Sequence, residues 1–330
     1  MSKTVCLTGA TGQVASYLIE LLLEDPNENY IVHGLKRSCS NTNTERIDHI
    51  FNNPKYKDRF FLHYGDLGDT ASINAFVADQ KPDYFFNCGA VSHVRTSFDI
   101  PEYTYDITGI GTLRILESIR KHSPQTRFLQ CSTSELYGGM TREPQNETTP
   151  FYPRSPYATA KLASFWTVKN YRESYGLFAA NAISFNHESP RRAHNFFTKK
   201  IIKFCCRAKL GLEDSVNLGY LGSYRDFSHA KDIAEGLIKI TNHDTPEEFV
   251  LASGKTISMQ KFVEKVFGKL NLDYHKYIKF DQRLTRPNEV EYLHGDASKA
   301  AKILNWAPKY TLDMLIDEMI EYELNKIGNK

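Results

Sequence analysis

The sequence has little of what would place a chain in a membrane or on a nucleic acid. No apolar run within its 330 residues approaches the roughly 20 residues that cross a bilayer. No long apolar segment stands near the start, as it does in a secretory signal, so we expect a soluble, cytoplasmic protein without a membrane partner. Lys and Arg number 41 against 39 Asp and Glu, a net charge of +2. This balance argues against a nucleic-acid partner, because phosphate binding needs a concentrated basic excess.

Disulfide and metal patterns are missing as well. None of the six cysteines has zinc-ligand spacing, and the adjacent Cys205 and Cys206 cannot form an ordinary disulfide with each other. Cys6, Cys88 and Cys131 stand in apolar, strand-like runs, which is typical of reduced packing thiols. The eleven histidines form no H-x-x-x-H or H-E-x-x-H unit, so we expect no metal site.

What the sequence does have is an alternation of strand-like and helix-like segments. Strands alternating with helices predict right-handed crossovers and a parallel sheet. The expected strands are 5–8, 30–35, 60–64, 84–88, 128–132 and 178–185. The expected helices include 13–23, 70–79, 111–122, 157–175, 198–210 and 312–324. We therefore predict an α/β fold with a Rossmann-type, doubly wound parallel sheet and a smaller C-terminal α/β substrate lobe.

The chain length and the loss of regular alternation after the sixth strand predict two unequal lobes. Residues 1–185 should form a dinucleotide-binding Rossmann domain. Residues 186–330 should mainly form the substrate domain, with a segment near 225–240 returning to the first domain. No Pro- or Ser-rich linker separates them, so we expect a shared interface and cleft.

The first strand ends in a glycine pattern that is typical of dinucleotide binding. Gly9 and Gly12 allow a tight turn, and the helix that begins near Gln13 offers free N–H groups to a pyrophosphate. Thr11 lies within this turn, and Ala15 takes the small-residue position of the G-x-x-G-x-x-G/A fingerprint. The alternative is a strand–helix turn that binds nothing.

The end of the second strand favours NADP over NAD. A carboxylate at this position would repel the 2′-phosphate of NADP. This sequence instead has Lys36 and Arg37, and Arg37 can bond a phosphate bidentately. Asp66, which follows the third strand, is placed to accept from the adenine amino group. Lys36 and Arg37 could instead be a solvated surface pair.

Tyr157 and Lys161 open a long helix and lie one turn apart on the same face. A nearby ammonium and an oxidised nicotinamide both favour the phenolate, so we expect a lowered tyrosine pKa. Tyr157 could then act as the base towards a sugar hydroxyl while hydride leaves the carbon.

The fifth strand ends in Thr133, Ser134 and Glu135. Hydride transfer needs only a hydroxyl donor such as Thr133 beside the Tyr–Lys pair, so Ser134 and Glu135 are surplus to it. Oxidation at carbon 4 of a hexose acidifies the carbon 5 proton, and a carboxylate can remove that proton while carbon 6 loses water. The alternative is a strand-end Ser/Thr cluster that makes turn hydrogen bonds beside an exposed Glu.

Long blocks of sequence resemble the extended short-chain dehydrogenase/reductase family and, within it, the GDP-mannose 4,6-dehydratases. The resemblance covers nearly the whole chain. Its blocks are NTERIDHI (43–50), STSELYG (132–138), ETTPFYPRSPY (147–157), FNHESPRR (185–192) and RPNEVE (286–291).

This resemblance implies a set of residue roles and an assembly. Thr133 would bond the sugar 4-hydroxyl, Glu135 would be the carbon 5 base, Tyr157 the oxidation base, and Lys161 would hold the cofactor ribose. Residues 37–46 match a loop that covers the NADP of a neighbouring subunit, which implies a homo-oligomer, either a dimer or a tetramer. Further cofactor contacts are implied for Leu67, His187 and Arg192, and substrate contacts for Ser92, Asn186, Lys200, Arg225 and Arg286.

Three positions depart from the family pattern. Val14-Ala15 replaces Asp-Gly in the phosphate loop, and Val91 replaces a Gln near the nicotinamide or sugar. Ala193-His194-Asn195 stands where Gly-Glu-Thr is usual, beside the expected sugar pocket, and the loss of an acid there alters charge and hydrogen bonding. GDP-manno-heptose is therefore an alternative to GDP-mannose.

The expected reaction is a 4,6-dehydration of a GDP-linked sugar, with a tightly bound NADP that is recycled in every turnover. A C4 dehydrogenase or a 4-epimerase on the same scaffold is the alternative enzyme. A non-catalytic, NADP-sensing binding module is the alternative from another class.

Overall fold

The larger lobe is built on a seven-stranded sheet whose strands are rich in apolar and β-branched residues. The computed structural model describes residues 2–40 and 42–328. The seven strands follow the order β10-β6-β5-β4-β1-β2-β3 and all pair in parallel. They are β1 (Lys3–Thr8), β2 (Tyr30–Lys36), β3 (Phe60–Tyr64), β4 (Tyr84–Asn87), β5 (Arg127–Thr133), β6 (Ala179–Ser184) and β10 (Glu248–Leu251).

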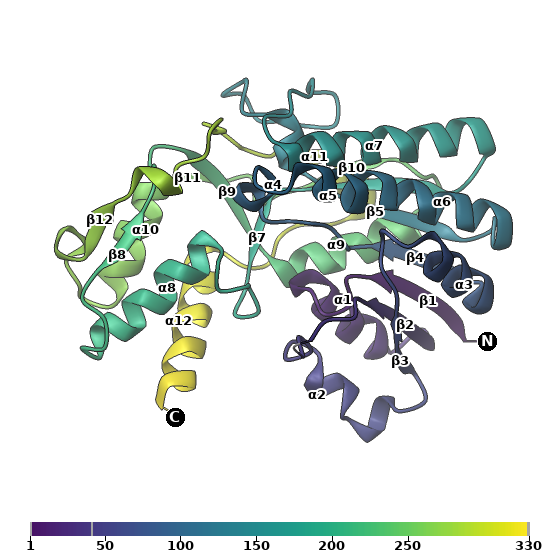
Figure 1. Cartoon of the computed structure of the whole chain (residues 1–330), viewed down its shortest axis with the longest axis horizontal. Helices are drawn as coiled ribbons and strands as arrows, with labels where there is room; N and C mark the ends of the chain where they lie inside the picture. The colour runs from purple at the N-terminus through teal and green to yellow at the C-terminus, as the bar shows by residue number, and fades with distance from the viewer. Residues whose placement is uncertain (1, 41, 329–330) are drawn as a thin grey trace.

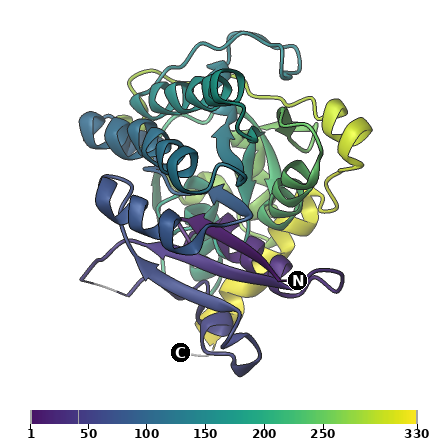
Figure 2. The same cartoon turned by 90° about the vertical axis from the view of Figure 1, so that its right-hand side faces the viewer.

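Helices cover both faces of this sheet (Figures 1 and 2). The α-helices of the described residues are α1 (Gln13–Leu23), α2 (Asp48–Phe51), α3 (Thr70–Gln80), α4 (Val94–Ser97), α5 (Pro101–Tyr105), α6 (Gly111–His122), α7 (Pro156–Tyr175), α8 (Phe197–Lys209), α9 (Ala230–Asn242), α10 (Met259–Lys269), α11 (Ser298–Leu304) and α12 (Leu312–Gly328). The predicted doubly wound, Rossmann-type sheet is confirmed.

Alternating residues along the strands supply a separate core to each face of the sheet. In β1, Val5 and Leu7 pack with α1, α9 and α11, whereas Cys6 packs with α3, α6 and α7. Successive side chains of a strand point to opposite faces, so one apolar run fills both cores. This explains why the first strands are continuously apolar rather than alternating with polar residues.

The chain leaves the larger lobe after β6 and then returns to it. Helix α9 packs against α1, and β10 joins the sheet beyond β6 with Phe249 paired to Ala182. Trp306, after α11, is buried in the same core and donates from Nε1 to the carbonyl of Asp232 on α9 at 2.9 Å. The returning part of the chain therefore includes β10 and α11 as well as α9.

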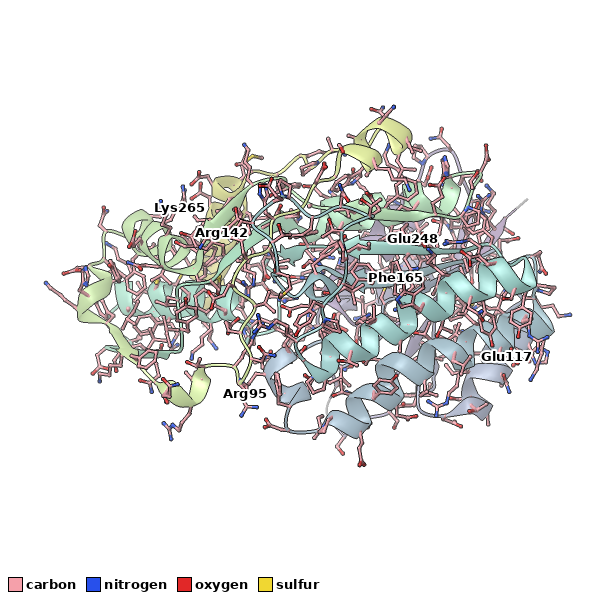
Figure 3. All side chains as sticks on the ribbon, turned by 90° about the horizontal axis from the view of Figure 1, so that it is seen from above. Arg95, Glu117, Arg142, Phe165, Glu248 and Lys265 are labelled. Carbon is pink, nitrogen blue, oxygen red and sulfur yellow. The ribbon has the colours of Figure 1, made fainter. Side chains whose placement is uncertain are left out.

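The smaller lobe is a helical cluster with short strands on its surface. Its core contains apolar residues of α8, α10 and α12. The strands β8 (Val216–Leu218) and β12 (Ile278–Phe280) pair in parallel. A three-stranded sheet of β7 (Asn186–Glu188), β9 (Tyr224–His229) and β11 (Thr256–Ser258) lies between this lobe and the large sheet (Figure 1). In Figure 3, Lys265 of α10 in the smaller lobe and Glu117 of α6 in the larger lobe lie at opposite ends of the molecule.

Candidate active site

A cavity of about 460 Å³ lies between the carboxyl ends of the large sheet and the smaller lobe. The strand order reverses between β1 and β4, and this crevice is where open α/β sheets bind ligands. Fifteen of the nineteen predicted site residues line it: Gly9, Gly12, Gln13, Ser92, Thr133, Ser134, Glu135, Tyr157, Lys161, Asn186, His187, Arg192, Lys200, Arg225 and Arg286.

The glycine turn forms the nucleotide end of this cavity. Gly9 has a positive φ of 65°, and a Cβ there would lie 3.0 Å from the backbone of Gly89, so only glycine fits. Helix α1 begins after Gly12, and because glycine has no side chain, no side chain of the N-cap residue accepts from the first N–H groups of the helix. The first turn of α1 therefore keeps N–H groups and positive dipole available to an anion. Gln13 lines the cavity, but its side chain donates to the carbonyl of His187 at 3.0 Å.

Four predicted cofactor residues, Thr11, Arg37, Asp66 and Leu67, do not line the cavity. Arg37 follows β2 and donates from Nη1 to the hydroxyl of Tyr103 at 2.8 Å. Asp66 follows β3 and accepts from the backbone N–H of Gly68 at 2.8 Å. Because β1, β2 and β3 are parallel neighbours, Arg37 and Asp66 still lie at the same sheet edge as the glycine turn.

Tyr157 and Lys161 project from the first turns of α7, as expected. Ser155 caps this helix by accepting from the N–H of Ala158 at 3.1 Å, with Pro156 in the first position. Lys161 donates from Nζ to the carbonyl of Cys131 at 2.6 Å, and burial lowers its pKa. Burial raises the pKa of Tyr157, and a hydrogen bond with Thr133 opposes that rise. The lowered tyrosine pKa expected from the sequence depends also on a bound oxidised nicotinamide, so it stays a prediction.

Glu135 occupies a one-turn helix directly after β5. Its N–H donates to the hydroxyl of Thr133 at 3.2 Å, and Arg286 donates from Nη1 to its Oε1 at 3.3 Å. The residue is only 7% exposed, unlike the exposed Glu of the alternative interpretation. Ser134 beside it is also buried and lines the same cavity.

Two arginines of the smaller lobe share a carboxylate that the sequence analysis did not single out. Glu289 accepts from Arg225 Nη2 at 3.0 Å, and its Oε1 lies 3.6 Å from Arg286 Nη1. Burial lowers the pKa of Arg225. The signal for Glu289 was its place in the RPNEVE block, three residues after Arg286. Lys200 completes the basic side of the cavity and donates from Nζ to the carbonyl of Asn217 at 2.7 Å.

A second missed carboxylate lies at the junction with β7. Glu188 is buried, which raises its pKa, and its Oε2 lies 3.1 Å from Arg192 Nε. The guanidinium of Arg192 lies 3.5 Å from the ring centre of Phe196. Burial lowers the pKa of the neighbouring His187 to about 4, so this ring is neutral near pH 7. The spacing of Glu188 and Arg192 within one motif could have indicated this pair.

Several residues that line the cavity each carry a buried polar atom with no hydrogen-bond partner among the described residues. These atoms are Ser132 Oγ, Glu135 Oε2, Ser184 Oγ and Asn186 Oδ1. A buried polar atom without a partner is costly in a folded protein, so these atoms indicate polar ligand groups. Together with the glycine turn, they fit a dinucleotide and a sugar.

The three departures from the family pattern lie in different places. Val14 and Ala15 line the cavity at the glycine turn. Val91 does not line it; its side chain packs with the core between the sheet and α3. Of the segment 193–195, only Asn195 lines the cavity.

Across residues 2–40 and 42–328, no helix is long and apolar enough to cross a membrane. The same described residues contain no group of three or more His, Cys, Asp or Glu side chains placed to hold a metal ion.

Solved structures share this Rossmann-type architecture. The dTDP-glucose 4,6-dehydratase of Streptomyces venezuelae, solved with NAD and TYD bound, superposes with a TM-score of 0.87 at 19% identity. The match covers 98% of each chain. At this identity the likeness concerns the fold.

Sequence relatives narrow the class. Residues 6–319 match the family model of GDP-mannose 4,6 dehydratase. The GDP-mannose 4,6-dehydratase of Yersinia enterocolitica is 44% identical, with 98% of this chain and 94% of the relative covered. The human GDP-mannose 4,6 dehydratase is 43% identical, with 96% and 90% covered. The chain belongs to the GDP-mannose 4,6-dehydratase family, which confirms the resemblance inferred from its motifs.

Proposed function

We propose that the protein is a hydro-lyase that converts a GDP-mannose-type sugar to its 4-keto-6-deoxy product. The observation that carries this proposal is the meeting of Thr133, Glu135 and Tyr157 in one cavity, with Glu135 Oε2 buried and without a partner among the described residues. A carboxylate in that position is what an elimination needs and what a simple oxidation does not.

The glycine turn and Lys161 support binding of a nicotinamide dinucleotide, with the first turn of α1 facing its pyrophosphate. Lys36 and Arg37 at the end of β2 favour NADP, because Arg37 can pair with a 2′-phosphate. A nicotinamide cofactor, when bound, accepts a hydride from carbon 4 and returns it to carbon 6, so no stoichiometric reductant is consumed.

The side chains of the cavity divide the proton transfers between them. Tyr157 Oη takes the proton of the carbon 4 hydroxyl, while Thr133 bonds that hydroxyl and holds the phenol. Glu135 Oε2 takes the carbon 5 proton. Ser134 or the protonated Glu135 then delivers a proton to the leaving carbon 6 hydroxyl. Lys161 remains anchored on the Cys131 carbonyl, where it positions the cofactor ribose.

The basic side of the cavity supports a nucleoside diphosphate sugar as substrate. Lys200, Arg225 and Arg286 supply the cations for its two phosphates, and Asn186 supplies an amide. GDP-manno-heptose is a second candidate substrate, because Asn195 lines the cavity where the family usually has a different residue. We further propose that the larger lobe binds the cofactor, that the smaller lobe binds the sugar nucleotide, and that the protein is a cytoplasmic homo-oligomer.

Turnover in deuterated water tests the elimination. With GDP-mannose or GDP-manno-heptose, the product should carry solvent deuterium at carbon 5 and should have lost the carbon 6 oxygen. Absence of both changes in a product oxidised at carbon 4 would contradict the proposal and favour a C4 dehydrogenase. Inversion at carbon 4 with the carbon 6 oxygen retained would favour a 4-epimerase. Tight NADP binding with no turnover of any GDP-sugar would favour a binding module.

The Glu135→Gln variant isolates the role of the carboxylate. Loss of a positioned general base should lower kcat by about 10²- to 10⁴-fold, with the reaction stalled after oxidation at carbon 4. Glu143→Gln is the matched control, because Glu143 is exposed and outside the cavity. Equal activity of the two variants would remove Glu135 from the mechanism.

A further inference from the structure

Two cysteines on neighbouring strands meet at the floor of the candidate active site. Cys131 is in β5, and Cys88 directly follows β4, whose register pairs Asn87 with Gln130. The two sulfur atoms are 3.5 Å apart, and both residues line the cavity. Neither the proton transfers nor the ligand contacts proposed above use these thiols.

The geometry suits a disulfide. Neighbouring strands lie about 4.8 Å apart, which is within the roughly 4.4–6.8 Å that a disulfide allows between Cα atoms. The sulfur atoms need to approach by roughly 1.5 Å to reach the bond length of about 2.05 Å, a shift that rotation about the side-chain bonds can supply. The parallel register holds both thiols on the same face of the sheet.

The two thiols are chemically unequal. A hydrogen bond between the two thiols, which either sulfur can donate, lowers the pKa of the Cys131 thiol, with a smaller contribution from Lys161. The same bond and burial raise the pKa of Cys88. Lys161 lies beside Cys131, because its Nζ bonds the Cys131 carbonyl at 2.6 Å, and a neighbouring cation favours a thiolate. The thiolate is the nucleophile in cysteine oxidation, so we assign Cys131 as the attacking residue and Cys88 as the resolving one. Both are partly exposed, and the cavity gives a small oxidant access to them.

We propose that Cys88 and Cys131 are an oxidation site at which a peroxide forms a disulfide that inactivates the enzyme. The Cys131 thiolate attacks hydrogen peroxide and becomes a sulfenic acid, releasing hydroxide. The Cys88 thiol then attacks that sulfur and displaces water. In total, two thiols and one peroxide give one disulfide and two waters, and a dithiol reductant reverses the reaction.

The effect on activity, which rests on the proposed function, follows from the position of the pair. The carbonyl of Cys131 anchors Lys161 Nζ at 2.6 Å. The backbone of Cys88 packs closely against Gly9 of the glycine turn, where an added Cβ would lie 3.1 Å from the Cys88 carbonyl carbon. Because both cysteines line the cavity, rotation of their side chains into a disulfide changes the cavity wall beside Lys161 and the glycine turn. A displacement on the order of 1 Å in an active site can cost about 10²-fold in rate, so we expect a loss of that size.

The test uses the full-length Cys39→Ser protein, because Cys39 is exposed and would also react. Reduced protein is treated with hydrogen peroxide, quenched with catalase, alkylated under denaturing conditions and digested for mass spectrometry. A linked pair of peptides carrying Cys88 and Cys131 should appear in step with the loss of turnover. The buried Cys6, Cys205 and Cys206 should remain alkylatable in the same digest. Dithiothreitol should restore both the thiols and the activity.

Cys88→Ala and Cys131→Ala are the matched variants, each compared with its own reduced activity. Cys88→Ala should lose dithiothreitol-reversible inactivation and should accumulate sulfenic or sulfinic acid at Cys131. Absence of the linked peptides in the parent protein would overturn the oxidation site. Linked peptides with unchanged turnover would overturn its inactivating effect. Because the link is detected without an activity assay, failure of the proposed dehydration leaves this test intact.

Discussion

Arg286 donates from Nη1 to Oε1 of Glu135 at 3.3 Å, although the two residues are 151 positions apart in the chain. Arg286, which we propose binds the diphosphate of the substrate, is therefore in direct contact with Glu135, the proposed carbon 5 base. Arg286 also lies 3.6 Å from Glu289, so its guanidinium is held between two carboxylates. A diphosphate that binds Arg286 would compete with Glu135 for the guanidinium group of Arg286.

Arg286→Ala should raise the KM for the GDP-sugar about ten- to one-hundredfold. A hydrogen bond to a charged group contributes about 1.5–3 kcal/mol, and 1.4 kcal/mol corresponds to about tenfold in affinity. Steady-state kinetics check this value. Arg283→Ala is the control, because Arg283 is exposed and pairs with Asp281. A KM that is the same in both variants would exclude Arg286 as a diphosphate ligand.

Thr133→Val should move the acid limb of the kcat–pH profile to higher pH. Burial raises the pKa of Tyr157, and the hydrogen bond with Thr133 opposes it, so loss of that bond raises the pKa further. The base form of Tyr157 then appears only at higher pH. Thr159→Val serves as the control, because Thr159 is exposed and bonds only the carbonyl of Ser155 at 3.0 Å. An unshifted profile would mean that Tyr157 is not the base whose ionisation limits turnover.

Acid should destabilise the protein through a histidine pair on β2 and β3. Nδ1 of His33 lies 2.9 Å from Nε2 of His63, and burial, with a contribution from His63, lowers the pKa of His33 to about 4. The pKa of His63 is also lowered by burial, with Asp79 opposing. The unfolded chain, with a histidine pKa near 6.5, binds more protons than the folded chain below that value. Stability is therefore full above about pH 6.5 and falls as the pH drops towards about 4.

Urea unfolding midpoints between pH 7.5 and 4.5 measure this loss. His33→Gln should flatten the pH dependence, because it removes the group with the lowered pKa. His275→Gln should leave the dependence as in the parent, since His275 is exposed. Parallel curves for the parent and His33→Gln would contradict the assignment.

The buried ion pair of Lys199 and Glu323 should control docking of α12 on α8. Both side chains are almost fully buried, and Lys199 also donates to the carbonyl of Pro190 at 2.8 Å. Lys199→Met leaves a buried carboxylate unpaired, so the free energy of unfolding should fall by about 3–5 kcal/mol. Lys199→Met combined with Glu323→Leu should recover most of the loss. Denaturant titrations compare the three proteins, and a double variant as unstable as the single one would contradict this account.

The sheet was largely predictable because its strands are apolar runs separated by helices with clear start signals. Helix α1, helix α6 and strand β3 begin and end where the sequence indicated, and the other five of the first six strands differ by one or two residues at one or both ends. The pairing of the short strands β7, β9 and β11 with one another could not be predicted from the sequence. They are three to six residues long, and their partners lie far along the chain, so tertiary contacts decide their register.

The site was predictable where one motif carries one chemical role, as for Tyr157 and Lys161. It was not predictable where the function of a side chain depends on a partner from another segment. The role of Glu289 depends on its hydrogen bond from Arg225, and the role proposed for Cys88 depends on its contact with Cys131, 43 residues later. Burial by several segments, which raises the pKa of Tyr157, could likewise not be predicted from the local spacing of Tyr157 and Lys161.

The return of β10 to the large sheet has a consequence for dissecting the protein. All six residues of β6 are buried, and β10 pairs along its outer side. A fragment ending near residue 185 would expose the unpaired N–H and C=O groups of β6 along an apolar edge, a template for pairing between molecules. Neither lobe is thus a contiguous stretch of chain, and we expect the first 185 residues alone to aggregate rather than bind nucleotide as an isolated domain.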